Sequence, residues 1–124
     1  MLLVESRRDD RSMYTEYLRL RGFTVLEADT TDEALFHAVQ SDVIVTGVRV
    51  NGSFDGLELV RKLRADASTQ SKPIIVLTAW AFEPSRQLAL AAGCDIFLTK
   101  PCLPEMLATE SRRALRLRSR AKKR

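Results

Sequence analysis

Pro73-Ile74-Ile75-Val76-Leu77-Thr78-Ala79 is the most strand-like stretch of the chain. Its apolar residues follow one another without alternation, which is typical of a strand that is buried on both faces of a parallel sheet. Pro84 lies just beyond, where proline commonly opens a helix, and Gly93 is placed to end that helix. Another strand is predicted at 95–99, and Pro104 opens a last helix. This half of the chain therefore alternates strand and helix.

The same alternation is predicted toward the N-terminus. Three strands are expected at 1–5, 23–28 and 42–46, and helices at about 9–21, at 30–40 and from Asp55 onward. Thr30 with Glu33, and Asp55 with Glu58, form the spacing of a helix N-terminal cap. Five strands alternating with five helices predict an α/β fold with right-handed crossovers and a parallel sheet that is covered on both faces.

Length and composition indicate one globular domain. The chain has 124 residues, of which 45% are hydrophobic and 29% charged. Its apolar runs are too short to cross a bilayer and no signal peptide is evident, so we expect a cytoplasmic protein without membrane contact. The net charge of +4 is uneven, because residues 111–124 hold eight of the twenty basic residues and no acid. The other twelve basic residues face sixteen acids, so residues 1–110 carry about −4. We expect a domain at 1–117 and a basic tail at 118–124.

The two cysteines are too few for a disulfide framework. Cys94 and Cys102 flank the strand expected at 95–99, which separates them by roughly 16 Å. A direct disulfide needs Cα atoms within about 7 Å. We interpret both as reduced structural thiols, and no zinc-binding spacing is present.

The candidate site is predicted from the fold. In open doubly wound sheets, ligands bind beyond the carboxyl ends of the strands. The residues expected at those ends are Glu5 and Ser6, Thr46 and Gly47, Thr78 and Ala79, and Lys100 and Pro101.

Four motifs carry a resemblance to a known family. They are Leu-Leu-Val-Glu at 2–5, Phe-Asp-Gly-Leu-Glu-Leu at 54–59, Leu-Thr-Ala at 77–79 and Phe-Leu-Thr-Lys-Pro at 97–101. Up to about residue 117 the chain resembles the CheY-like receiver domain of bacterial two-component response regulators. This resemblance implies a flavodoxin-like sheet of five parallel strands in the order 2-1-3-4-5 with five helices. It also implies phosphoryl transfer from a histidine kinase to an aspartate, with bound magnesium.

The chain departs from this family at the residues that carry its chemistry. Two adjacent acids end the family's first strand, whereas here Glu5 is followed by Ser6. The register of 42–45 places the family's acceptor aspartate at Gly47. The hydroxyl of Thr46 is no substitute, because neighbouring side chains of a strand point to opposite faces. We therefore expect no acceptor here, no metal site and no cofactor, with magnesium binding lost.

Other family positions are retained. Thr78, Phe97, Lys100 and Pro101 stand at the spacing of the family's switch and phosphate site. Each has an ordinary structural interpretation by itself, as a strand residue, a core aromatic, a surface lysine or a loop proline, but their joint occurrence favours descent from a working receiver. We expect Lys100 to pair with Glu5, which leaves the site either neutralised or tolerant of anions.

Residues around this site admit two interpretations each. Trp80 is expected at the pocket rim, either stacked on Arg49 or packed against the fourth helix. Asp9 and Asp10 open the first helix, where we interpret them as caps rather than as metal ligands. His37, within the second helix, is interpreted as a structural residue rather than a phosphoryl acceptor.

The functional hypothesis is a non-phosphorylatable receiver, or pseudo-receiver, of a bacterial two-component or phosphorelay pathway. It is expected to act by protein interaction and not as an enzyme. Its partners would be signalling proteins or a second copy, bound through the fourth helix, fifth strand and fifth helix, at 84–92, Phe97 and 104–117. One alternative is a receiver that is still phosphorylated at a non-standard acceptor. Another is a DNA-associated regulator that works through its basic residues 112–124.

Overall fold

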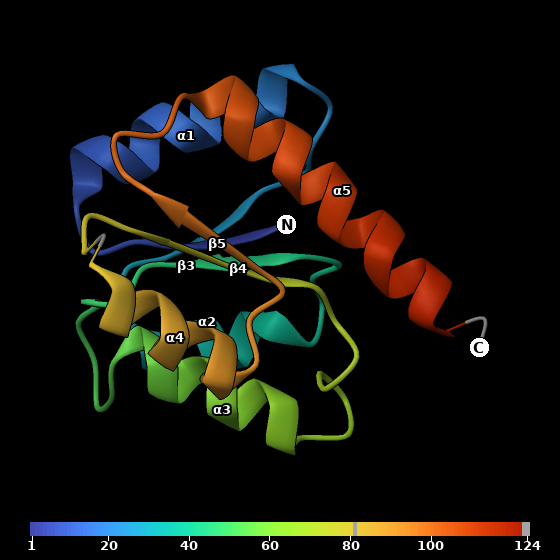
Figure 1. Cartoon of the computed structure of the whole chain (residues 1–124). Helices are drawn as coiled ribbons and strands as arrows, with labels where there is room; N and C mark the ends of the chain where they lie inside the picture. The colour runs from blue at the N-terminus through green and yellow to red at the C-terminus, as the bar shows by residue number, and fades with distance from the viewer. Residues whose placement is uncertain (81, 123–124) are drawn as a thin grey trace.

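The structure, a computed structural model, describes residues 1–80 and 82–122, with side chains through Ser119. Strands and helices alternate along the whole chain (Figure 1). The strands are β1 (Leu2–Val4), β2 (Leu26–Ala28), β3 (Ile44–Thr46), β4 (Ile74–Thr78) and β5 (Ile96–Thr99). The helices are α1 (Arg8–Leu20), α2 (Thr31–Ala38), α3 (Gly56–Ala65), α4 (Glu83–Ala92) and α5 (Pro104–Lys122).

All strand pairs are parallel, and the sheet has the order β2-β1-β3-β4-β5. The predicted flavodoxin-like fold is therefore confirmed. All five strands are shorter than expected, and the difference is largest at the starts of β2 and β3, because residues 23–25 and 42–43 precede their first paired residues.

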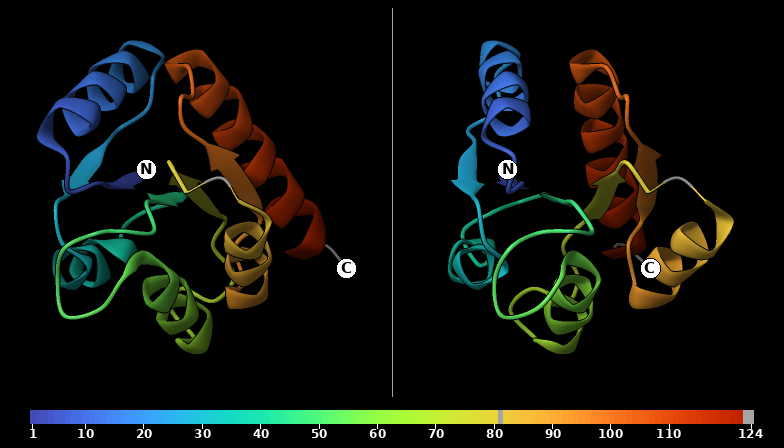
Figure 2. Two further views of the ribbon diagram at one scale, coloured as in Figure 1. Left: turned by 60° about the vertical axis from the view of Figure 1, so that its left-hand side comes forward. Right: turned by 90° about the vertical axis from the view of Figure 1, so that its left-hand side faces the viewer.

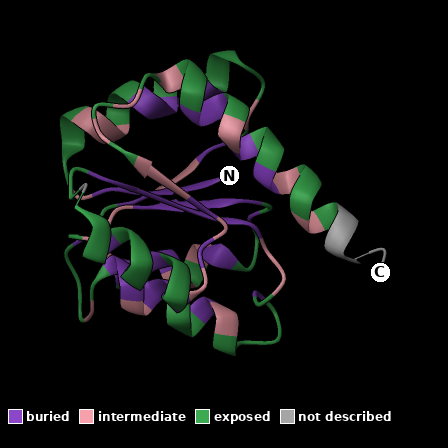
Figure 3. Ribbon diagram, in the orientation of Figure 1, coloured by how far each residue is buried: buried purple, intermediate pink, exposed green. Residues whose placement is uncertain are grey.

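Helices cover both faces of the sheet, with α1 and α5 on one face and α2, α3 and α4 on the other (Figures 1 and 2). The apolar strand residues alternate between these two layers. Leu2 and Val4 belong to the core under α2, α3 and α4, whereas Leu3 belongs to the core under α1 and α5. The central strands β1, β3 and β4 are buried throughout, the edge strands β2 and β5 are only partly buried, and the outer helix faces are exposed (Figure 3).

The predicted helix caps are confirmed. Thr30 Oγ1 accepts a hydrogen bond from the backbone N–H of Glu33 at 3.2 Å, and Asp55 Oδ1 accepts one from that of Glu58 at 2.8 Å. Gly93 ends α4 with a φ of 119°, a left-handed conformation that favours glycine. These residues therefore determine where α2 and α3 begin and where α4 ends.

Helix α5 crosses the boundary expected at residue 117 and continues to Lys122, beyond the edge of the sheet (Figure 1). Arg118, the first residue of the expected tail, donates from Nη2 to Asp95 Oδ1 at 2.7 Å. This ion pair fastens the C-terminal part of α5 to the start of β5. Residues 123 and 124 of the expected tail lie outside the described residues.

No helix within residues 1–80 and 82–122 is both long and apolar enough to span a membrane. Cys94 and Cys102 are free thiols, as expected, the first buried and the second half-buried. Burial raises the pKa of the Cys94 thiol to about 11, which keeps it protonated and unreactive near neutral pH.

Candidate functional site

The carboxyl ends of four strands meet at one edge of the sheet. Val4 of β1 pairs with Thr46 of β3, so the residues that follow them, Glu5 and Gly47, are neighbours. The end of β4 is likewise in register with the end of β5. A cavity of about 180 Å³ opens here, and its lining includes Glu5, Gly47, Arg49, Thr78, Trp80 and Lys100. The structure thus brings together six of the residues predicted from sequence.

Lys100 lies between two carboxylates. Its Nζ donates to Glu5 Oε1 at 2.5 Å and to Asp10 Oδ2 at 2.8 Å. The expected pair with Glu5 is present. The Lys100 side chain is only 17% exposed and the Glu5 side chain only 10%. Burial alone would lower the pKa of Lys100, but the hydrogen bonds to Asp10 and Glu5 hold it above its ordinary value. The ammonium group therefore stays charged. It lies between the two carboxylates, where a metal ion would otherwise bind.

Asp10 belongs to this site, although its sequence context favours a helix cap. Helix α1 has Arg7 at its N-cap position and no side-chain capping bond. Asp10 instead contacts Lys100 and lies 3.9 Å from Arg7 Nε. The capping interpretation of Asp10 is therefore wrong. Local sequence could not indicate this contact, because the two partners are 90 residues apart.

Ser6, at the second acid position, is directed away from Lys100. Its hydroxyl donates to the Asp29 carbonyl at 2.9 Å and accepts from the backbone N–H of Asn51 at 2.8 Å. It thereby joins the loop after β1 to the loops after β2 and β3. This side chain fixes loops rather than supplying a carboxylate to the cavity.

Gly47 leaves room at the end of β3. A Cβ atom placed there would lie 3.5 Å from Val50 Cγ2 and 3.6 Å from the Leu77 carbonyl oxygen, which are ordinary contacts. Gly56 is different, because a Cβ there would lie 1.7 Å from the Gly47 carbonyl oxygen. The Gly56 N–H also donates to the Val48 carbonyl at 2.8 Å. The first turn of α3 therefore packs directly on the strand end, while the space for a side chain at position 47 remains.

The other retained family positions lie where the sequence placed them. Thr78 ends β4, is 4% exposed, and accepts through its hydroxyl from the Trp80 N–H at 3.0 Å. Phe97 is half-buried against the core under α2, α3 and α4. Pro101 follows Lys100 through a cis peptide bond. Whether these residues still act as a switch stays a prediction.

Arg49 and Trp80 form the rim of the cavity. The guanidinium carbon of Arg49 lies 3.6 Å from the centroid of the Trp80 ring, so stacking on Arg49, one of the two arrangements considered for Trp80, is present. The Trp80 ring also lies 5.6 Å from that of Phe82, with a tilted geometry. Both aromatic side chains are exposed. The rim therefore combines a cationic group with exposed aromatic surface.

The donors at this edge do not fit magnesium. Magnesium prefers near-octahedral coordination by several oxygen ligands. Here the carboxylates of Glu5 and Asp10 both bind the Lys100 ammonium, Ser6 is directed elsewhere, and Gly47 has no side chain. Across the described residues, no group of three or more acidic, histidine or cysteine side chains is arranged to hold a metal.

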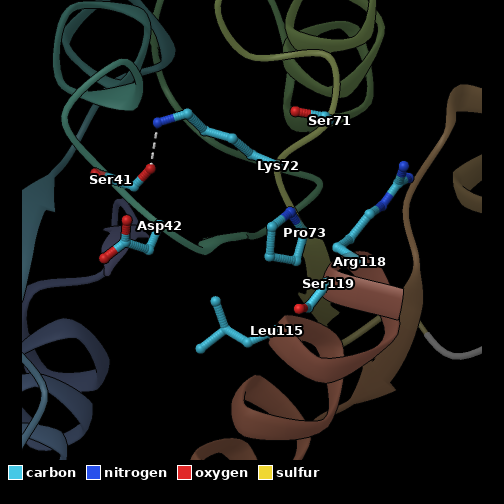
Figure 4. A pocket seen from close by; sticks show the side chains of 8 residues that line it. All are labelled: Ser41, Asp42, Ser71, Lys72, Pro73, Leu115, Arg118 and Ser119. Carbon is cyan, nitrogen blue, oxygen red and sulfur yellow. Dashed lines mark hydrogen bonds between the residues drawn. The ribbon is translucent and has the colours of Figure 1, made fainter. Parts of the chain in front are cut away.

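A larger cavity, of about 390 Å³, lies at the opposite edge of the sheet, near α5 (Figure 4). Lys72 and Arg118 both line it. Lys72 donates from Nζ to the carbonyls of Val39 and Ser41, and Arg118 is paired with Asp95. Its cations are therefore used in holding loops and α5 together, and it lies away from the carboxyl ends of the strands. We interpret this cavity as a gap between packed elements and not as a binding site.

The fold and the strand-end geometry define a member of the flavodoxin-like signalling domains. The model of the response regulator receiver domain family matches residues 1–112. The chain belongs to this family, whose members are signalling modules of two-component systems.

Two curated relatives show that similar domains occur in different kinds of protein. The phosphate regulon transcriptional regulatory protein PhoB of Pseudomonas aeruginosa is 34% identical over 120 residues, which are 94% of this chain and 51% of PhoB. A cyclic di-GMP phosphodiesterase of Thermotoga maritima is 32% identical over 118 residues, which are 95% of this chain and 31% of that protein. The chain thus spans about half the length of such relatives, or less.

Solved structures agree. The chemotaxis protein CheY4 of Vibrio cholerae superposes with a TM-score of 0.83 at 30% identity, covering 91% of this chain and 95% of CheY4. The receiver domain of sensor histidine kinase PA1611 from Pseudomonas aeruginosa has a TM-score of 0.83 at 29% identity and covers 92% and 94%. That receiver has a magnesium ion coordinated in its active-site cleft.

Proposed function

We propose that this receiver domain is a pseudo-receiver that signals through protein interaction, without phosphorylation at the end of β3 and without magnesium. The observation that carries the proposal is the position of Lys100. Its ammonium group binds Glu5 and Asp10 at the strand ends, next to a glycine at the position where the family has its acceptor. The nucleophile and the free carboxylates that phosphoryl transfer would need are both missing from this arrangement.

Phosphoryl transfer to a receiver requires an oxygen nucleophile and a cation that neutralises the charge of the transferred group. Gly47 offers no nucleophile, and Thr46 cannot replace it, because its hydroxyl donates to the Gly47 carbonyl. Asp10 is bound to the retained Lys100, so the ion pair occupies its carboxylate. These contacts support an input other than a phosphoryl group.

The surface formed by α4, β5 and α5 supports a role in protein interaction. It exposes large apolar side chains on both helices and on the segments that precede them, at Phe82, Leu88, Leu90, Leu103 and Met106. Large apolar side chains that are exposed in the free domain gain stability when a partner covers them. We propose this surface as the site where a signalling protein or a second copy binds, in the cytoplasm of a bacterial cell.

A magnesium titration tests the proposal, with the fluorescence of Trp80, the single tryptophan, as the reporter. We expect no saturable response in the natural chain. The variant Ser6→Asp/Gly47→Asp restores two carboxylates to the family positions, and it should respond at millimolar magnesium if the scaffold is otherwise intact. A saturable response of the natural chain to magnesium, but not to sodium at equal ionic strength, would contradict the proposal.

One alternative is favoured by a specific observation. Helix α5 carries the exposed basic residues Arg112, Arg113 and Arg116, and the PhoB relative is a transcriptional regulatory protein. Contact with DNA through this helix would follow the general rule that clustered positive charge attracts phosphate. Arg113 is already paired with Glu110 at 3.0 Å, which weakens this alternative. Gel shifts at low and moderate salt, with and without residues 112–124, distinguish it.

A further inference from the structure

We propose that a groove between α1 and α5 is a docking site for an acidic segment of a partner protein, whose carboxylates pair with Arg21 and Arg112. The groove shares no lining residue with the cavity at the strand ends. The inference is independent of the proposed function, because it needs neither phosphorylation nor its absence. It adds a second contact to the one proposed for the surface of α4, β5 and α5.

Helices α1 and α5 lie side by side on one face of the sheet (Figure 2). A hollow of about 580 Å³ lies between the end of α1 and the first half of α5, and we call it the α1/α5 groove. Its lining includes Tyr17, Leu20, Arg21, Glu105 and Arg112. This volume is within the range of roughly 300 to 1,000 Å³ that is usual for ligand pockets, so side chains of a partner can enter the groove.

The α1/α5 groove uses a different side of α5 from the surface proposed above. Glu105, Thr109 and Arg112 recur at helical spacing, and all three line the groove. The exposed residues Leu103 and Met106 lie on another side of the helix, because their positions are offset by about a third of a turn or more from this stripe. Binding in the groove therefore leaves the apolar surface of α5 accessible.

Both arginines are held in place by contacts that leave most of their donors unused. Arg21 Nε donates to Tyr17 Oη at 3.0 Å, and its guanidinium carbon lies 5.3 Å from the Tyr17 ring centroid. Arg112 Nη2 donates to the Arg21 carbonyl at 2.8 Å, and its guanidinium carbon lies 4.6 Å from the Phe23 ring centroid. A guanidinium group has five N–H donors, so donors remain on both groups. The two cations are thus pre-organised to bind carboxylates.

The cations of the α1/α5 groove have no counter-charge. Among the side chains that the structure describes, neither Arg21 nor Arg112 forms an ion pair with an acid. Glu105 is the only acid in the lining, so the groove carries about +1. Arg116 is exposed one helical turn beyond Arg112 and extends the positive charge. A surface with this excess attracts an acidic segment and repels a basic one.

Two features favour a protein segment over nucleic acid. Leu20 lies at the edge of the groove and is 81% exposed, which provides an apolar contact that a sugar-phosphate backbone does not use. Glu105 would repel the closely spaced phosphates of a duplex, whereas a peptide can place its fewer carboxylates away from this side chain. We therefore expect a segment that combines acidic residues with an apolar side chain.

The test is the binding of fluorescein-labelled peptides to the full chain, measured by fluorescence anisotropy. The probe is a short peptide of glutamate and leucine at helical spacing, and its control has glutamine in place of each glutamate. We expect saturable binding of the acidic peptide that weakens as salt is added, and much weaker binding of the control. Absence of binding, or equal binding of the two peptides, would refute the proposal.

Variants of single arginines locate the binding site. Arg21→Gln and Arg112→Gln should each weaken binding about tenfold, because each removes charge-assisted hydrogen bonds. Arg8→Gln and Arg86→Gln make the same charge change at exposed positions outside the groove and should bind like the natural chain. Equal weakening in all four variants would show only a general attraction of charge and overturn the assignment to the groove.

Leu20→Ser tests the apolar contact without removing a charge. Because Leu20 is exposed, the variant should keep the unfolding midpoint of the natural chain while binding the acidic peptide several times more weakly. Arg112 also bonds the end of α1, so the urea midpoint of each variant is measured in parallel. If the arginine variants lose stability but bind the peptide unchanged, these residues only cap α1 and the proposal is refuted.

Two other occupants of the groove are tested with the same variants. Tighter binding of a labelled DNA duplex than of the acidic peptide, lost in Arg21→Gln, would replace the proposal by a nucleic-acid contact. Sedimentation that shows a dimer of the natural chain, dissociated by Arg21→Gln, would assign the groove to a second copy and likewise overturn the proposal.

Discussion

Replacing Lys100 by methionine tests the structure of the site most sharply. The change keeps the length of the side chain but removes the ammonium group that binds Glu5 and Asp10. Loss of one partner from a buried ion pair typically costs about 3 to 5 kcal/mol, because the remaining charge is left without compensation. Asp10 keeps 32% of its side-chain exposure, so water partly compensates it. We therefore expect the free energy of unfolding to fall by about 2 kcal/mol.

For a domain of this size, that loss corresponds to a thermal midpoint lower by about 8 °C. Urea unfolding followed by circular dichroism measures the free energy directly. Lys62→Met is the matched control, since this exposed lysine only lies 5.0 Å from the Phe54 ring, and we expect a change within about 0.5 kcal/mol. Adding Glu5→Gln to Lys100→Met should recover part of the loss, because it removes a buried unpaired carboxylate.

Cation binding should increase in the same variant. Without Lys100, the carboxylates of Glu5 and Asp10 are unpaired, so magnesium should stabilise Lys100→Met more than the natural chain. The structural role of the ion pair is refuted if Lys100→Met loses less than about 0.5 kcal/mol, or if its loss equals that of Lys62→Met.

Three further predictions follow from other contacts. Gly56→Ala should lower the free energy of unfolding by about 3 kcal/mol, because its Cβ would overlap the Gly47 carbonyl oxygen. Gly47→Ala should change this free energy by under about 1 kcal/mol, because its Cβ would meet only ordinary contacts. Urea unfolding midpoints measure both changes. Because burial raises the pKa of the Cys94 thiol from 9.0 to about 11, the unfolded chain ionises first, so stability should fall as pH rises through this range. Cys94→Ala should flatten that fall, and an unchanged slope would exclude the thiol as its cause. Asp95→Ala should remove the anchor of Arg118 and speed hydrogen exchange at residues 115–119, and unchanged exchange there would contradict the role of the ion pair.

The fold could be predicted from sequence because its signals are local. Apolar runs such as 73–79 indicate buried strands, and the caps at Thr30 and Asp55 mark helix starts that the structure confirms. The limits of β2 are harder to predict, since β2 can pair only along the length of its neighbour β1, whose first paired residue, Leu2, lies opposite Leu26. The residue at which α5 ends could not be predicted either, because its last turns are held partly by the distant Asp95.

The site could be predicted in part. The strand ends of a parallel sheet must meet, so the order of elements along the chain suffices to place Glu5, Gly47 and Lys100 together. The role of Asp10 depends on a contact across 90 residues, and local sequence favours a capping role instead. The turn of Ser6 toward Asp29 likewise depends on three loops whose arrangement the sequence does not specify.

The central claim is that this receiver signals without phosphorylation, and intact-mass spectrometry after treatment with acetyl phosphate and magnesium tests it most directly. A receiver known to be phosphorylated by the reagent serves as the positive control. We predict that the mass of the natural chain stays unchanged while the control gains a phosphoryl group. A phosphoryl group retained on any aspartate of this chain, Asp10 included, would contradict the claim.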